Sequence, residues 1–273
     1  ASITLYPEGG DMVEGVTGRI AFEALSAEGR HLRGKLKIAD AKGNVVAEGK
    51  TMSRGRGTVV FTPQPETQYT CTFDDGEHTY DVKFPKVAPS GVALKATVTA
   101  TRLEIDITSK GLEKDEQLGM TIMSSGIVDT TINLTQHGMH HSLPLTSMLA
   151  GVIDVTVFNQ EGRVYADRLV FNIPAYNFIA PNTVTIEGAD KPVAAYKPVT
   201  LTLRSGTQKP GIVSVAVMDA ATTDYTYDNA SLLTEMLLTS EIRGFVEDPG
   251  YYFEAVDDKH RSDLDLLMMV QGW

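Results

Sequence analysis

The chain has 273 residues, which is more than one ordinary β-sandwich or helical bundle needs and favours two or three domains. Its 42% hydrophobic and 22% charged residues are typical of a globular protein in water. The net charge of −11 would repel phosphate backbones and anionic lipid headgroups, so it argues against binding to nucleic acid or to a membrane surface. No stretch approaches the roughly 20 apolar residues of a transmembrane helix.

Short alternating segments dominate the first part of the chain. In GRIAFEAL, Ile20 and Phe22 fall on one face of a predicted strand and charged residues fall on the other. Further strands follow in GKLKIADAKGNVVAEG and GTVVFTPQPETQYTCTF, separated by turns rich in Gly, Asn and Pro. The single cysteine, Cys71, alternates with threonines, so we expect a buried and unreactive thiol. The pattern predicts an antiparallel β-sandwich.

Two proline-containing segments divide the strands into sets. FPKVAPSGVAL carries Pro85 and Pro89, and IPAYNFIAP lies between Pro174 and Pro181. The second set ends in the hairpin VTVFNQEGRVYADRLVF, and the third contains NTVTIE, KPVTLTLRS and GIVSVAVMDA. Because the units are near 90 residues, we predict one macroglobulin-like sandwich in each. The predicted domains are residues 1–88, 89–175 and 176–273.

The pattern changes to helical spacing after Asp224. DNASLLTEMLLTSEIRGF places Leu233, Met236 and Leu237 on one face of a helix, with Asp, Asn or Ser available as its cap. SDLDLLMMV predicts a second short helix, whose Ser262 and the acidic residue three positions later match a capping box. The third domain is therefore expected to carry two short helices.

We expect these two helices to pack on each other or on the third strand set, because isolated helices this short are marginal in water. The leucines predicted to be buried are Leu233, Leu237, Leu264 and Leu267. The apolar strand faces available to cover them carry Val199, Leu201 and Leu203, or Val213, Val215 and Val217.

The sequence HGMHH is the one cluster of metal-ligating residue types. On a strand, His140 and His141 would point to opposite faces, so at most two imidazoles could converge. No Cys, Asp or Glu adjoins them in sequence to complete a site. We expect an exposed hairpin or loop without a native metal, in which His137 and His140 are the nearest approach to a ligand pair.

Tyrosines gather on both sides of the first predicted helix. Tyr225, Tyr227, Tyr251 and Tyr252 would form a binding platform if they were exposed in one plane. We favour a satellite core beneath the helices, because helices on a sandwich need apolar cover. The acidic clusters LEKDEQ and EAVDDKHRSDLD are interleaved with basic residues, as solvated turns usually are. No catalytic or cofactor-binding signature is found, so no cofactor is expected.

Strings spread over essentially the whole chain carry a family resemblance. They are YPEGGDMVEGVTGRIAFEA, FTP, APSG, GVIDVTVFNQEGRVYADRLVF, SVAVMDA, LLTSEIRGFVEDPGYYF and LDLLMMVQGW. The first resembles the opening of the second macroglobulin-type (MG2-type) domain of the α2-macroglobulin superfamily. All of them resemble the version found N-terminal to TonB-dependent receptor-type regions in Bacteroides-type outer-membrane proteins.

The resemblance implies an accessory region of an envelope protein, periplasmic or associated with the outer membrane, whose chain continues beyond Trp273. The thioester of the superfamily needs Cys-Gly-Glu-Gln, whereas Cys71 is followed by Thr-Phe-Asp, so that covalent chemistry is unavailable. The partner would be another envelope protein or the remainder of the same longer chain.

We therefore predict tandem antiparallel β-sandwiches, macroglobulin-like or fibronectin-III-like, with a short helical appendage. Their expected function is that of a non-catalytic spacer or docking module in an outer-membrane receptor-like assembly. One alternative is a carbohydrate- or protein-binding module, which would need exposed tyrosines in one plane. The other is an enzyme with an interdomain site, which would need a deep pocket with at least two perturbed titratable groups.

Overall fold

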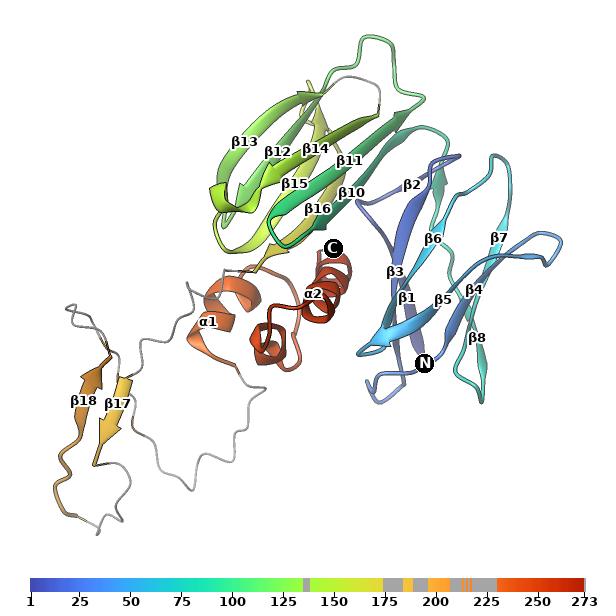
Figure 1. Cartoon of the computed structure of the whole chain (residues 1–273). Coiled ribbons are helices and arrows are strands. Elements are labelled where there is room, and N and C mark those ends of the chain that lie inside the picture. The colour runs from blue at the N-terminus through green and yellow to red at the C-terminus, as the bar shows by residue number, and fades with distance from the viewer. Residues whose placement is uncertain are drawn as a thin grey trace. The chain divides into compact units, whose positions relative to one another are not determined.

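The computed structural model describes residues 1–134, 138–173, 184–188, 196–206, 213, 215, 217 and 230–272 (Figure 1). The strands are β1 (Ser2–Pro7), β2 (Met12–Val13), β3 (Gly18–Leu25), β4 (Lys35–Asp40), β5 (Val45–Ser53), β6 (Arg56–Phe61), β7 (Tyr69–Asp74), β8 (Thr79–Val82), β9 (Val87–Ala88), β10 (Gly91–Val98), β11 (Arg102–Lys110), β12 (Leu118–Ser124), β13 (Ile127–Leu134), β14 (Met139–Pro144), β15 (Gly151–Asn159), β16 (Val164–Asn172), β17 (Val184–Glu187) and β18 (Thr202–Ser205). The helical elements are η1 (Leu145–Ser147), α1 (Leu232–Thr234), η3 (Glu235–Thr239), η4 (Pro249–Phe253) and α2 (Asp258–Gln271). The contacts define two compact units, residues 1–173 with 228–273, and residues 174–227.

The first sandwich is a seven-stranded antiparallel sheet in the order β1-β3-β6-β5-β4-β7-β8. The sheet folds over on itself because β5 pairs with β4 along its first part and with β6 at its end. Ile20, Phe22, Leu36 and Phe73 meet inside and are at most 1% exposed. Cys71 is buried in the same core, as the alternation predicted, and burial raises the pKa of its thiol to about 12.

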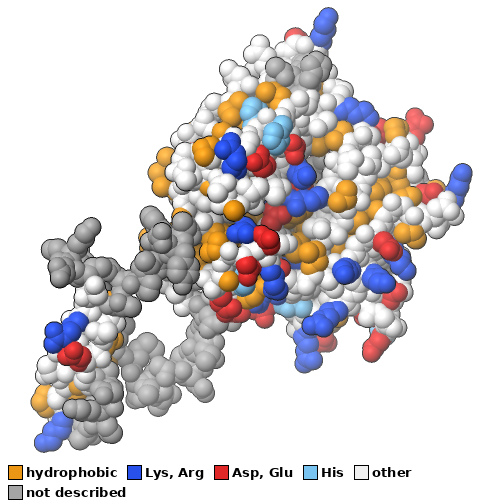
Figure 2. Space-filling model, in the orientation of Figure 1, with side chains coloured by type: hydrophobic (Ala, Val, Ile, Leu, Met, Phe, Trp, Pro, Cys, Tyr) orange, Lys and Arg blue, Asp and Glu red, His pale blue; other side chains and the backbone are white. Residues whose placement is uncertain are grey.

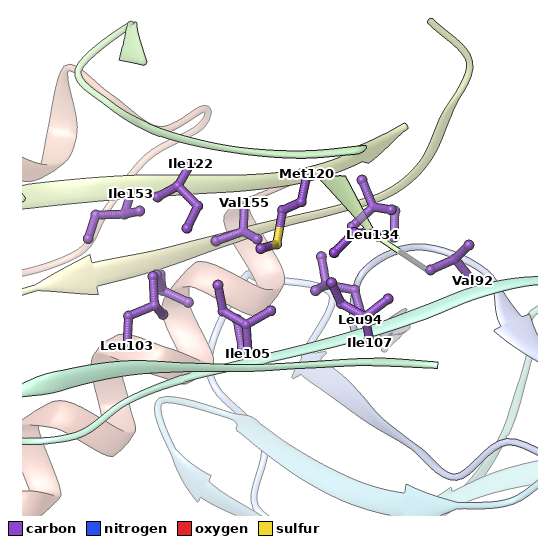
Figure 3. Close-up of a cluster of buried hydrophobic side chains, with 14 of the residues drawn as sticks. Val92, Leu94, Leu103, Ile105, Ile107, Met120, Ile122, Leu134, Ile153 and Val155 are labelled. Carbon is purple, nitrogen blue, oxygen red and sulfur yellow. The ribbon is translucent and has the colours of Figure 1, made fainter. Parts of the chain in front are cut away.

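The second sandwich consists of two facing sheets, β10-β11-β14 and β13-β12-β15-β16. Figure 3 shows how side chains from β10 and β11 point toward those from β12 and β15. Leu103, Ile105, Met120, Ile122 and Ile153 are fully buried between the sheets. The predicted hairpin forms the pair β15–β16. The fold class is thus mostly β, with antiparallel sandwiches and a short C-terminal helix, as predicted. The division into domains 1–88, 89–175 and 176–273 stays a prediction.

The first helical segment begins with a capping box at Ser231. The Ser231 side chain accepts a hydrogen bond from the backbone amide of Thr234, and the Thr234 hydroxyl accepts one from the backbone amide of Ser231. The segment then widens into a π-helical turn in η3. Thr234 and Leu238 are buried four residues apart, while Met236 between them is 62% exposed. The buried face of this segment is therefore shifted by one residue from the predicted one, and Leu233 and Leu237 are only half-buried.

The α2 helix is longer than the predicted one. It begins after Asp257, whose side chain caps the helix by accepting a hydrogen bond from the backbone of His260. Ser262 lies inside the helix, so the predicted capping box there was wrong. The physical reason is that Asp257 already satisfies the free amide groups one turn earlier.

Both faces of α2 are covered by sandwich residues, and Leu264 and Leu267 are buried as predicted. Leu267 shares a cluster with Leu238 and with Phe171 of β16, so the two helical segments pack on each other and on the second sandwich. The opposite face of α2 packs on Ala21 of β3. The described valines of the third strand set are exposed: Val199, Val213, Val215 and Val217.

The second unit contains the antiparallel pair β17–β18. Ile186 lies opposite Leu203 in this pair, and both side chains are exposed. Arg204 and Glu187 form an ion pair in which both side chains are more than half exposed.

Candidate functional site

The histidine cluster does not form a metal centre among the described residues. His140 lies on the outer face of β14, where its Nδ1 is 2.7 Å from Asp106 and its Nε2 is 3.2 Å from Glu104. The two ring nitrogens point apart, so these carboxylates cannot join them around one ion. Over the described ranges, no group of three His, Cys, Asp or Glu side chains could hold a metal. His137 lies outside those ranges.

His140 is instead a surface charge partner. The hydrogen bond that its Nδ1–H donates to Asp106 raises the pKa of the His140 imidazole, and the charges of Asp106 and Glu104 add to the rise. His141 lies opposite Ile105, a core residue, so the two histidines face opposite sides of β14 as predicted.

The tyrosines after the first helical segment are packed rather than displayed as a platform. Tyr252 is 1% exposed and belongs to the cluster that also holds Leu267. Tyr251 is half-buried, and its ring meets that of Tyr252 at 71°. The two rings are therefore neither exposed together nor coplanar. Tyr225 and Tyr227 lie outside the described residues.

Tyr251 and Tyr252 help to join the helical segments to the first sandwich. The Arg56 guanidinium donates to the Tyr252 hydroxyl at 3.3 Å and to Glu23 at 2.8 Å. The Arg54 guanidinium lies 4.9 Å from the centre of the Tyr251 ring, a cation–π distance. Both arginines come from the β5–β6 hairpin, so this hairpin contacts η4 through a hydrogen bond and a cation–π interaction.

A second set of charges joins three parts of the chain at one point. Glu8 follows β1, Arg19 lies on β3, Arg168 lies on β16, and Asp265 lies on α2. Arg19 binds both carboxylate oxygens of Glu8, at 2.6 and 2.7 Å, and donates to Asp265 at 2.9 Å. Arg168 donates to Glu8 at 3.1 Å and forms an ion pair with Asp265. We call these four residues the junction network.

The junction network is electrically balanced and fully paired, with two of its side chains buried and two partly exposed. The side chains of Glu8 and Arg168 are 1% and 2% exposed, and two carboxylates face two guanidiniums. The Glu8 carboxylate also accepts a hydrogen bond from the backbone of Ala96 on β10, at 3.2 Å. Burial lowers the pKa of Arg19, but hydrogen bonds and charges of Glu8 and Asp265 outweigh this and leave it raised. Every charge is committed to another, so the network can hold parts together but offers no free base or nucleophile.

Local structure explains how Glu8 reaches this point. The turn after β1 continues through Gly9, whose φ of 77° favours glycine, and a Cβ there would lie 2.8 Å from the carbonyl oxygen of Leu94. The turn also contacts β16, because the backbone of Asp167 donates to the carbonyl of Gly9 at 3.0 Å. Glycine thus lets the first sandwich approach the second closely enough to pair its charges.

The sequence of β16 contains one sign of this network. Ala166, Arg168 and Val170 alternate along β16 and are all buried, so an arginine stands where the pattern calls for an apolar residue. A buried charge needs a partner, and the partner here is 160 residues away in the chain. The alternation marks Arg168 as unusual, but only the fold reveals Glu8 and Asp265.

Beside the junction lies a groove of about 420 Å³, on the outer face of β15 and β16. It is lined by Asp154, Asp167, Glu241 and Arg243, among others. Loss of solvation around its carboxyl raises the pKa of Asp167 to about 7, although much of the side chain is exposed, and the Asp154 carboxyl adds to the rise. Two carboxyl groups in this position resemble a pair that shares one proton.

Charges elsewhere on the described surface are mixed. Figure 2 shows acidic and basic side chains intermingled on one face of the molecule rather than sorted by sign. Within the part of the chain that the structure describes, no helix is both long and apolar enough to cross a membrane.

No protein-family profile and no curated protein matches the chain. Among solved structures, domains 4–9 of the surface layer protein SbsC align with 68% of this chain and 32% of that one, at 14% identity and a TM-score of 0.34. The BSP domain of a biofilm associated protein aligns with 66% of this chain and 30% of that one, at 15% identity and a TM-score of 0.30. A segment of two fibronectin type-III domains from chicken tenascin aligns with 62% of this chain and 99% of that one, at 14% identity and a TM-score of 0.22.

The chain spans less than a third of the length of the first two structures, and at these identities the likeness concerns the fold alone. These structures are β-sandwich modules, whereas the macroglobulin-type assignment stays a prediction. The function must therefore be argued from the residues of this chain.

Proposed function

We propose that the chain is a non-catalytic structural region of a bacterial cell-envelope protein, in which the two sandwiches form a rigid spacer or docking arm. The observation that carries this proposal is the position of Asp265. One carboxylate on α2 pairs with Arg19 of the first sandwich and with Arg168 of the second. The three parts are thus tied through a single group.

Rigidity follows from the cost of separating these parts. Domains joined by a proline-containing linker move relative to each other unless their interface is large or strongly held. Here, undocking of the first sandwich would part Glu8 from Arg168 and would expose the apolar contact between Ala21 and α2 to water. The docked arrangement keeps this apolar surface buried and its charges paired, so the undocked arrangement is disfavoured.

The setting of this arm is an extracytoplasmic assembly at the outer membrane, with a receptor-like region of the same chain or another envelope protein as partner. The family resemblance of the sequence supports this setting. The acidic balance of the chain disfavours nucleic acid as a partner. The buried Tyr252 gives no support to a carbohydrate platform, and the committed charges of the junction network give none to an enzyme with its site there.

Distances between two spin labels test the proposal. Lys42 and Ser125 are exposed on turns of the first and second sandwich, and each can be changed to cysteine for labelling. The native Cys71 is buried with a raised pKa, so it should remain unlabelled. Pulsed electron resonance should give one narrow distance distribution.

A matched variant shows whether the junction network causes the rigidity. With Arg168→Met in the doubly labelled protein, the distribution should broaden, whereas with Arg204→Met in the exposed β17–β18 pair it should not. A broad distribution in the protein without either change would overturn the proposed rigid arm.

A further inference from the structure

The contact between the two sandwiches has an acidic pair directly beside it. The backbone of Asp167 donates to the carbonyl of Gly9, and the neighbouring Ala166 bridges to Gly10. This is where the first sandwich rests on β16. A change in charge at the Asp167 side chain therefore occurs on a residue whose backbone amide bonds to the first sandwich.

The partner in the pair is Asp154 on β15. It lies diagonally across from Asp167 on the same face of the sheet, because Asp154 is opposite Leu169 and Thr156 is opposite Asp167. The Thr156 hydroxyl is 3.0 Å from Asp154 and 3.4 Å from Asp167. A hydroxyl has one proton to donate, so it cannot satisfy both carboxylates at once.

The other groups that face the pair do not cancel its charge. The segment after η3 contributes Glu241 and Arg243, and α2 contributes the neutral Gln271. The first sandwich contributes the backbone of its glycine turn. Counting only described side chains that line the groove, three carboxyl groups face one guanidinium. The pair is thus held together most easily when one proton lies between its two members.

We propose that the Asp154–Asp167 pair is a pH-sensitive element of the sandwich junction, which keeps the Gly9 turn docked on β16 while it shares a proton and loosens that contact when the proton is lost. This inference rests on the proposed function to the extent that the junction is what the pair adjusts.

The direction and the size of the pH effect on docking follow from proton linkage. The pKa of Asp167 is raised to about 7 in the docked arrangement, against roughly 4 for a free Asp side chain. A raised pKa means that the docked form binds the proton more tightly, so docking is favoured at low pH and weakens as pH rises through 7. Asp154 stays beside Asp167 on the β15–β16 hairpin when the Gly9 turn leaves, so these two values give an upper bound: the docking equilibrium should fall by up to roughly tenfold between pH 6 and pH 8.

Hydrogen exchange at the backbone amide of Asp167 tests this proposal, because that amide donates to Gly9 across the contact. We expect its protection factor, corrected for the intrinsic pH dependence of exchange, to fall from pH 6 to pH 8 by up to roughly tenfold. In the variant Asp154→Asn with Asp167→Asn, protection should be the same at both pH values. The control variant Asp81→Asn, at an exposed position on β8, should behave like the unchanged protein.

The outcomes separate this proposal from the one on which it rests. An amide that is protected equally at pH 6 and pH 8 would overturn the pH-sensitive pair and leave the rigid junction standing. An amide without protection at either pH would overturn both. If the Asn variant is poorly folded, the unchanged protein still decides the matter, because its own pH series gives one of these results.

Discussion

Replacing Arg168 with Met should destabilise the protein strongly. Met keeps much of the apolar length of the side chain and removes the guanidinium, so the loss reports on charge pairing more than on volume. Arg168 is 2% exposed, and its partner Glu8 is 1% exposed. Removal of one member of a buried ion pair costs about 3–5 kcal/mol. Glu8 keeps both hydrogen bonds from Arg19, so we expect the lower end of that range, about 3 kcal/mol.

Urea denaturation followed by circular dichroism measures this loss, with Arg204→Met as its control. The Arg204–Glu187 pair is also in direct contact, at 2.7 Å, but its side chains are 66% and 57% exposed. It should therefore contribute about 0–1 kcal/mol to the free energy of unfolding. The double variant Glu8→Gln with Arg168→Met should cost less than the sum of the two single changes, because it leaves no charge without its partner. A loss below about 1 kcal/mol for Arg168→Met, within the range of an exposed pair, would refute the reasoning.

Three further changes test other parts of the structure. Tyr252→Phe removes the acceptor of the hydrogen bond from Arg56 and should cost about 1–3 kcal/mol in denaturation, since the guanidinium is buried; no loss would show that this bond is not made in solution. Deletion of residues 262–273 should lower the melting temperature by many degrees, because each buried leucine that it removes contributes about 1.5–3 kcal/mol; an unchanged melting temperature would mean that α2 is not packed. The ring of His140 should titrate in NMR above the ordinary histidine pKa, and Asp106→Asn should lower its midpoint; the pairing stabilises the fold below about pH 6.5 and is lost as pH rises through the raised pKa, so an unmoved midpoint would contradict the pairing.

Alternation in the sequence was sufficient to predict the two sandwiches. Ile20 and Phe22 are buried because strand side chains alternate with a period of two, and that period is visible without a structure. The same rule placed Cys71 in the core and gave the β15–β16 hairpin. These features depend on residues that are close in sequence, so a few consecutive residues are enough to predict each of them.

Features that depend on distant contacts could not be predicted in this way. Ala21 points away from the core of the first sandwich, yet it is 0% exposed because α2 covers it from 245 positions farther along the chain, at Leu266. The buried face of the first helical segment was missed because residues that cover Leu238, among them Tyr252 and Leu267, lie farther along the chain. The partners of Arg168 could not be named because a sequence pattern shows that a charge is buried but not what it meets.

The most direct test of a rigid arm is the rotational diffusion of its parts in solution. Relaxation of backbone nitrogen-15 nuclei gives a correlation time for each sandwich and for α2 separately. If the junction network holds them together, amides of β3, β12 and α2 should all report one correlation time, that of a single body. Shorter and unequal correlation times for the first and second sandwiches would show that they reorient independently, and would contradict the account.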